Sequence, residues 1–187
     1  LDLYARPYRE NEPVVCVDEK SKQLLEQLRA PIPASPGNPI KEDYEYKRAG
    51  TRNIFMAIEP KGGRRQTEVT AHRTKSDFVQ FISHLVKKVY IEAQKVHLVL
   101  DNLNTHFEEV LGLKQATRLL ERVEFHYTPK HASWLNMAEI EIGIMDRQCT
   151  GCRSPNEQAL RSEVVAWTCR RNQARSTIDW KFTRQDP

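Results

Sequence analysis

Three acidic residues in this chain have the types and spacing expected of a site for metal-assisted phosphoryl transfer. Asp18 and Asp101 each follow a short, mostly apolar run, and Glu139 lies in a stretch that passes from a turn into a helix. Two acids at strand ends and one near a helix start could meet at one edge of an open sheet. Clustered carboxylates bind hard divalent cations, and a pair of such ions supports in-line phosphoryl transfer.

An acid at the end of a strand also has a simpler interpretation, as a capping residue that only turns the chain. The residues after Asp101 include Asn102, Asn104 and Thr105, which suit a loop followed by a helix N-cap. The stretch around Asp101 leaves both interpretations open. The similar stretch at Asp18 and the third acid at Glu139 favour a catalytic site.

The elements that must position the first acid are predicted from the patterning of residues 14–71. A first strand covers residues 14–18, and Leu24, Leu25 and Leu28 predict one or two helical turns over residues 21–29. Four prolines between residues 30 and 40 exclude helix and sheet and predict an extended loop. Further strands are expected over residues 44–48, 52–59 and 66–71, the last two joined by a hairpin turn at residues 61–64.

The second half of the chain alternates between strands and helices. We expect a helix of about 17 residues capped by Ser76, a central strand at residues 96–100, a helix over about residues 105–121 and a strand at residues 123–127. A helix from Ser133 carries Glu139, and a final amphipathic helix covers residues 156–171. The order predicts the α/β class, with a mixed five-stranded sheet and helices on both faces.

Composition is compatible with DNA as a partner without requiring it. The 187 residues carry a net charge of +4, and the sequence pI is about 8.9. This length suits one domain with a substantial core. The sequence contains neither a signal peptide nor an apolar run as long as a membrane span, so a cytoplasmic, nucleoid-associated protein is expected. Because the first residue is Leu, the chain is expected to be a piece of a longer protein.

The four cysteines favour reduced thiols over a structural metal. Cys149 and Cys152 form a single CxxC, and zinc would need two further ligands that no second CxxC or paired histidine supplies. The pattern therefore fits a reducing compartment.

Four motifs carry a family resemblance. They are CVDEKS at residues 16–21, YKRAGT at 46–51, LDNLNTH at 100–106 and TPKHASWLNMAE at 128–139. In this order they resemble the DDE transposases of bacterial insertion sequences in the mariner superfamily. The resemblance implies a ribonuclease-H-like fold and matches the catalytic and metal-binding triad to Asp18, Asp101 and Glu139. It also implies two Mg²⁺ (or Mn²⁺) ions, transposon-end and target DNA as substrates, and a homodimer assembled on DNA.

The third acid has a competitor in Glu141. Two residues along a helix turn the side chain by about 200°, so only one of Glu139 and Glu141 can point into the site. The LN-x-x-E pattern favours Glu139. Asp146 lies about two turns further along roughly the same face and is too far to take part.

Other residues are candidates for DNA contact, each with a simpler alternative. Asn102 and His106 would orient a carboxylate or contact phosphate, unless Asn102 only satisfies its own loop. Lys130 and His131 would meet the DNA backbone, against the alternative of a solvated turn. A second basic patch consists of Lys47, Arg48 and Arg52, although an exposed strand edge looks the same. Trp134 is expected to pack under the helix that carries Glu139 rather than to stack on a base.

The resembling family also has an N-terminal helix-turn-helix region that reads transposon ends, and this chain lacks it. We therefore expect a linker at residues 1–12 and a catalytic domain at residues 13–187. Two alternatives stay open. One is a stand-alone metal-dependent nuclease of the same fold, and the other is a non-catalytic DNA-binding protein derived from a transposase.

Overall fold

The computed structural model of the chain describes residues 2–30, 32–41, 44–101, 107–130 and 132–181. Its regular elements, in chain order, are α1 (Asp2–Ala5), β1 (Val14–Gln27), β2 (Tyr46–Glu59), β3 (Arg64–Thr70), α2 (Lys75–His84), the π-helical turn η1 (Leu85–Val89), β4 (Val96–Leu100), α3 (Phe107–Leu111), α4 (Leu113–Leu120), β5 (Val123–Tyr127), the 3₁₀ turn η2 (Ser133–Leu135), α5 (Met137–Met145), the π-helical turn η3 (Asp146–Thr150) and α6 (Glu157–Gln173). None of the described helices is long and apolar enough to cross a bilayer.

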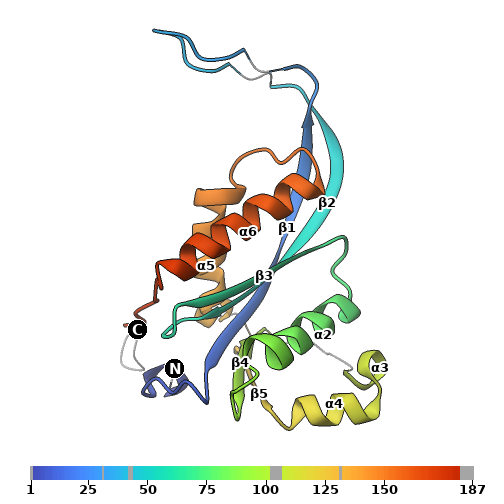
Figure 1. The fold of residues 1–187 in the computed structure, drawn as a ribbon, viewed down its shortest axis with the longest axis vertical. Coiled ribbons are helices and arrows are strands. Elements are labelled where there is room, and N and C mark those ends of the chain that lie inside the picture. Colours follow the sequence, from blue (N-terminus) through green and yellow to red (C-terminus); the bar gives the residue numbers. More distant parts are fainter. Residues whose placement is uncertain (1, 31, 42–43, 102–106, 131, 182–187) are drawn as a thin grey trace.

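The five strands form one mixed sheet in the order β3-β2-β1-β4-β5 (Figure 1). β1, β2 and β3 are an antiparallel meander, whereas β4 pairs in parallel with β1, and β5 pairs in parallel with β4. A parallel pair needs a crossover connection, and the helices between β3, β4 and β5 supply it. The predicted mixed five-stranded sheet is confirmed.

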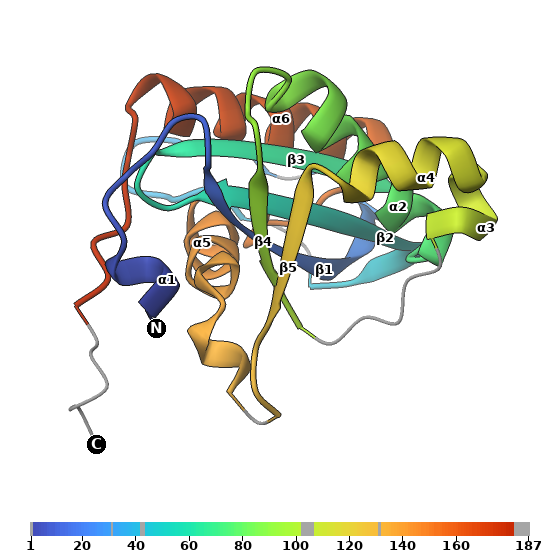
Figure 2. The same cartoon turned by 90° about the horizontal axis from the view of Figure 1, so that it is seen from below.

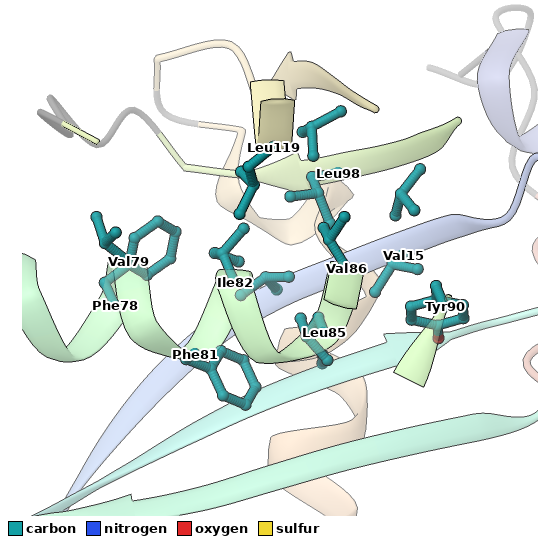
Figure 3. Close-up of a cluster of buried hydrophobic side chains, with 14 of the residues drawn as sticks. Val15, Phe78, Val79, Phe81, Ile82, Leu85, Val86, Tyr90, Leu98 and Leu119 are labelled. Atoms are coloured by element: carbon teal, nitrogen blue, oxygen red, sulfur yellow. The ribbon is translucent and has the colours of Figure 1, made fainter. Parts of the chain in front are cut away.

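Helices cover the two faces of the sheet, and the alternation of side chains along β1 shows why (Figure 2). Val15 and Val17 pack in a cluster with α2, η1 and α4, and Figure 3 shows Phe81, Leu85 and Leu98 within it. Residues with the opposite orientation belong to clusters with α5 and α6 on the other face, where Trp167 is buried. Complete burial of a side chain such as Phe81 contributes about 1.5–3 kcal/mol to stability.

The predicted helical turns over residues 21–29 are wrong, because β1 continues as a strand to Gln27. Ser21 pairs with Asn53, and the ladder extends, with a bulge between Gln23 and Leu25, to the pairing of Gln27 with Tyr46. These long-range hydrogen bonds override the local leucine spacing. The two strands predicted over residues 44–48 and 52–59 are likewise one strand, which passes through Gly50 at φ +92°.

The extended β1–β2 hairpin projects beyond the other strands (Figure 1). The proline-containing loop at its tip was predicted as extended and largely is so, with isolated bridges between Ile32 and Lys41 and between Ser35 and Asn38. The described part of this loop is mostly exposed.

Three helix boundaries differ from those predicted. Thr74 rather than Ser76 caps α2, because the hydroxyl of Thr74 accepts from the amide of Asp77 in a capping box. The helix expected over about residues 105–121 is divided between α3 and α4 at Gly112, whose φ of +75° a helix cannot contain. Ser133 begins only a 3₁₀ turn, and α5 starts after Asn136.

Candidate active site

Asp18 lies on β1 at the point where its parallel neighbour β4 ends. Val14, Val15 and Cys16 pair with His97, Leu98 and Val99, so the same register extended by two residues places Asp18 opposite Asp101. Neighbouring strands are about 4.8 Å apart. The sheet itself therefore brings the two acids together, although Asp18 is inside a long strand rather than at its end.

Thr128 extends this row of residues to a third strand. Leu100 pairs with Tyr127, so Thr128 follows β5 as Asp101 follows β4. The hydroxyl of Thr128 donates to Oδ1 of Asp101 at 2.6 Å, and its amide donates to the carbonyl of Leu100 at 3.1 Å. Thr128 thus fixes the orientation of the Asp101 carboxylate. Thr128 was not among the residues predicted to act in the site, and its position directly after the strand at residues 123–127 is the sequence signal for it.

Asn136 connects the helix of the third acid to the strand of the first. Its side-chain amide donates to the carbonyl of Val17 at 2.8 Å, and its Oδ1 accepts from the amide of Ala138 as the N-cap of α5. The residue is fully buried. Because Val17 precedes Asp18 and Glu139 lies in the first turn of α5, one side chain sets the position of one acid relative to another.

The pKa of Asp18 reflects both its burial and its acidic neighbours. Burial is the main cause that raises the pKa of Asp18 to about 7, and the negative charges of Glu19, Asp101 and Glu139 raise it further. The amide of Glu19, which donates to Oδ1 of Asp18 at 2.8 Å, opposes the shift. Glu139 is exposed and Asp101 half-buried, so the cluster opens to solvent.

These residues fit divalent cations. A partly buried carboxylate whose neighbours are also acidic is stabilised by a cation, and all the donors are hard oxygens. The three acids are not a compact single-ion cluster, however. Within the described part of the chain, only His97, Glu124 and His126 place three such ligand atoms within 4.8 Å of one another. The wider spacing of the acids suits ligands shared between more than one ion.

Comparison with known families decides the classification. Residues 13–161 match the model of the family described as DDE superfamily endonuclease. The chain belongs to the DDE superfamily of endonucleases. No curated protein sequence matches it significantly.

Solved structures confirm the ribonuclease-H-like fold of this DDE domain. It is similar to the Mos1 mariner paired-end complex with Mn, at a TM-score of 0.56 and 14% identity over 94% of this chain and 55% of that one. The Mos1 transposase paired-end complex with left transposon end matches at a TM-score of 0.53 and 12% identity, covering 89% and 53%. The chain thus spans a little over half the length of these transposases.

Glu141 has a different environment from Glu139 in the DDE domain. It is completely buried and accepts hydrogen bonds from the guanidinium of Arg65 at 2.6 and 3.0 Å. Arg171 donates to the same carboxylate at 2.9 and 3.2 Å. These hydrogen bonds outweigh burial and lower the pKa of Glu141. Asp146 is also committed elsewhere, to Lys20 and Thr150.

The DNA-contact candidates are divided between two regions. Lys47 and Arg48 are exposed on the outer part of β2, where Lys47 lies 3.6 Å from Glu26. Since Glu26 is eight residues beyond Asp18 on β1, this patch is about 25 Å from the acids. Arg52 instead forms an ion pair with Glu157 at 2.5 Å, and Glu157 also pairs with Arg161.

Lys130 is exposed and lies two residues after Thr128, the hydrogen-bond donor to Asp101. Asn102, His106 and His131 lie outside the described residues. Trp134 is 49% exposed. Its ring stacks on that of Trp180, with the ring centroids 6.3 Å apart, so Trp134 packs against the C-terminal segment.

The raised pKa of Asp18 predicts a pH-dependent cost to stability in the absence of metal. Because an unfolded Asp titrates near 3.8, folding takes up a proton between about pH 4 and 7, and stability falls across that window. Above pH 7 Asp18 is ionised in the folded chain, and the loss of stability has reached its full size. With EDTA present to remove metal, Asp18→Asn should raise Tm at pH 8 by about 3–6 °C. This corresponds to an increase of about 1–2 kcal/mol in the free energy of unfolding, reduced because Asp18 is partly in contact with solvent.

The gain should shrink as the pH falls and vanish below about pH 4, and thermal melts followed by circular dichroism between pH 8 and pH 4 measure it. Glu92→Gln, on an exposed turn, is the matched control and should leave Tm unchanged. A lower Tm for Asp18→Asn at pH 8 would show that the carboxylate stabilises the fold.

Proposed function

We propose that this chain is the catalytic domain of a DDE transposase, which cleaves DNA at transposon ends and joins the 3′ end to target DNA. The observation that carries the proposal is the row of Asp18 and Asp101 on neighbouring strands, with Glu139 held beside them through Asn136. Support comes from the family match and from the fold of the Mos1 complexes, one of which contains Mn.

Asp18, Asp101 and Glu139 would hold Mg²⁺ or Mn²⁺. When bound, such ions activate an attacking oxygen and stabilise charge on the leaving 3′ oxygen. Thr128 keeps one oxygen of Asp101 in a hydrogen bond and so orients the carboxylate. Asn136 holds the N-terminus of α5, whose dipole favours the negative charge of Glu139.

One site suffices for both reactions because they differ only in the attacking oxygen. In cleavage this oxygen belongs to water, and in strand transfer it belongs to the 3′-hydroxyl of the cleaved end. Each step breaks one phosphorus–oxygen bond and forms another, so a covalent protein intermediate is unnecessary. The proposed partners are accordingly transposon-end DNA and target DNA, bound by a dimer of this chain.

A strand-transfer assay tests this proposal against the stand-alone nuclease that the family description also allows. The chain is incubated with Mn²⁺, a target plasmid and labelled DNA duplexes. Each duplex carries an inverted repeat from the DNA that flanks the gene and ends in a free 3′-hydroxyl. A transposase joins the label to the plasmid. A nuclease nicks the plasmid and joins nothing. If no metal-dependent product of either kind forms, the catalytic assignment is wrong.

DNA affinity should be weak, since the net charge is only +4, and insensitive to sequence, since contacts to phosphate carry no sequence information. We expect micromolar or weaker binding at physiological salt and less than about tenfold preference, or ~1.4 kcal/mol, for end over random duplexes. Lys130→Ala should weaken binding to both duplexes equally. It should also reduce by about 1 the slope of the logarithm of the binding constant against the logarithm of the salt concentration. Fluorescence anisotropy across a salt series measures both quantities.

Lys88→Ala is the matched control for Lys130→Ala. Lys88 is exposed on η1, and η1 packs on the opposite face of the sheet from α5. Loss of the Lys88 charge should therefore leave the salt slope unchanged. A preference of a hundredfold or more for end DNA would mean that this chain reads bases itself.

A further inference from the structure

A second cluster of metal-ligand atoms lies on β4 and β5, outside the acidic site. Nδ1 of His97 is 3.0 Å from Nε2 of His126. The Glu124 carboxylate approaches both rings, with Oε2 3.6 Å from Nδ1 of His97 and Oε1 3.3 Å from Nε2 of His126. Two nitrogens and a carboxylate therefore face one point.

The strand register explains why these three side chains meet. His97 pairs with Glu124, and His126 pairs with Val99 two residues further along, so all three project from the same face of neighbouring strands, which lie side by side in Figure 2. Asp101 is four residues beyond His97 and two beyond Val99, the partner of His126, so the cluster lies about 7–13 Å from Asp101 along the strands. The cluster shares no residue with the three acids.

The distances match the spacing of ligands around a small transition-metal ion. Zinc binds histidine nitrogen at about 2.0–2.1 Å and carboxylate oxygen at about 2.0–2.2 Å. Tetrahedral geometry then separates neighbouring donor atoms by about 3.3 Å. The two nitrogens are 3.0 Å apart, and the Glu124 carboxylate approaches each ring with a different oxygen, at 3.6 and 3.3 Å. One ligand atom from each residue lies within 4.8 Å of the other two, so a shift of the exposed Glu124 side chain would complete the site.

The solvent exposure of the three ligands and the chemistry of their donor atoms indicate which metal ions the cluster would bind. The side chain of His97 is 8% exposed, that of His126 27% and that of Glu124 48%, so one side of the cluster is open to solvent. Three protein ligands with an open position suit an ion that retains a water molecule. Two imidazoles select zinc, cobalt or nickel over Mg²⁺, whereas the acids select hard ions.

We propose that His97, Glu124 and His126 form a Zn²⁺-class metal site that clamps β5 to β4. β5 ends one residue before Thr128, the donor to Asp101. An ion at this clamp fixes the edge strand that positions Thr128. The competing explanation is a metal-free network, in which one imidazole donates its proton to the other.

Isothermal titration of the EDTA-treated chain with Zn²⁺ tests the proposal. We expect one ion to bind with a Kd of ~1 µM or tighter, and Zn²⁺ in hundredfold excess over Kd to raise Tm by about 5 °C or more. His126→Gln should weaken binding by about 100-fold or more, because it removes a direct ligand. Glu124→Gln, at the most exposed ligand, provides an independent variant if His126→Gln does not fold.

Two controls separate this site from others in the chain. The triple variant Asp18→Asn/Asp101→Asn/Glu139→Gln should retain the Zn²⁺ ion, as should Cys149→Ser/Cys152→Ser. Bound Co²⁺ should show visible d–d bands without a thiolate charge-transfer band. Equal Zn²⁺ affinity in the unmodified chain and in both ligand variants would overturn the proposal, as would loss of binding with the cysteines.

Discussion

Asp101→Asn is expected to reduce metal-dependent DNA cleavage by about a thousandfold or more and to leave the fold intact. A loss of this size corresponds to about 4 kcal/mol of transition-state stabilisation. Asparagine has the shape of aspartate and can still accept the hydrogen bond from Thr128, but it lacks the charge that holds a divalent cation. Conversion of supercoiled plasmid to nicked circles in Mn²⁺ measures the effect.

The same loss is expected for Asp18→Asn and Glu139→Gln, since each removes one carboxylate from the cluster. Glu92→Gln is the control for an exposed acid away from the site. Thr128→Val should have a smaller effect than any of the three, because it frees the Asp101 carboxylate without removing it. Cleavage within tenfold of the unmodified chain for Asp101→Asn would exclude Asp101 from the chemistry.

Glu141→Gln is expected to lower the free energy of unfolding by about 3–5 kcal/mol, or Tm by about 10 °C. The guanidinium of Arg65 is completely buried against Glu141, and Arg171 donates to the same carboxylate. Loss of the negative charge leaves buried positive charge without compensation. Thermal and urea denaturation measure the change.

Glu139→Gln is the matched control, two residues away on the same helix. Glu139 is exposed, so its loss should abolish cleavage at unchanged Tm, whereas Glu141→Gln should lower Tm. A double variant, Glu141→Gln/Arg65→Met, should recover part of the lost stability because it also removes one buried charge. A destabilised Glu139→Gln with a stable Glu141→Gln would reverse the assignment of the third acid.

The sequence predicted the parts of the fold that depend on local patterning. The apolar run at Val96–Leu100 predicted the central strand, and the motif around Asn136 located the helix of Glu139. Prediction from the sequence failed where pairing with a distant segment determines the local conformation. Leu24, Leu25 and Leu28 have the spacing of a helix, but residues 21–27 are held as strand by pairing with β2.

The roles of the supporting residues also depend on contacts between distant segments. Asn136 reaches Val17 across 119 positions, and Thr128 reaches Asp101 across 27. Arg65 lies on β3 and Glu141 on α5, so their ion pair is visible only after folding. His97, Glu124 and His126 looked like ordinary alternation within two strands, because only the register brings them together.

Anomalous diffraction from a crystal soaked in Mn²⁺ tests most directly whether the three acids form one metal-dependent site. We expect a manganese peak in contact with both Asp18 and Asp101, with the Glu139 carboxylate on the same side and Glu141 still paired with Arg65. Manganese bound elsewhere in the chain, with none at Asp18 and Asp101, would show that the three acids are not the metal site.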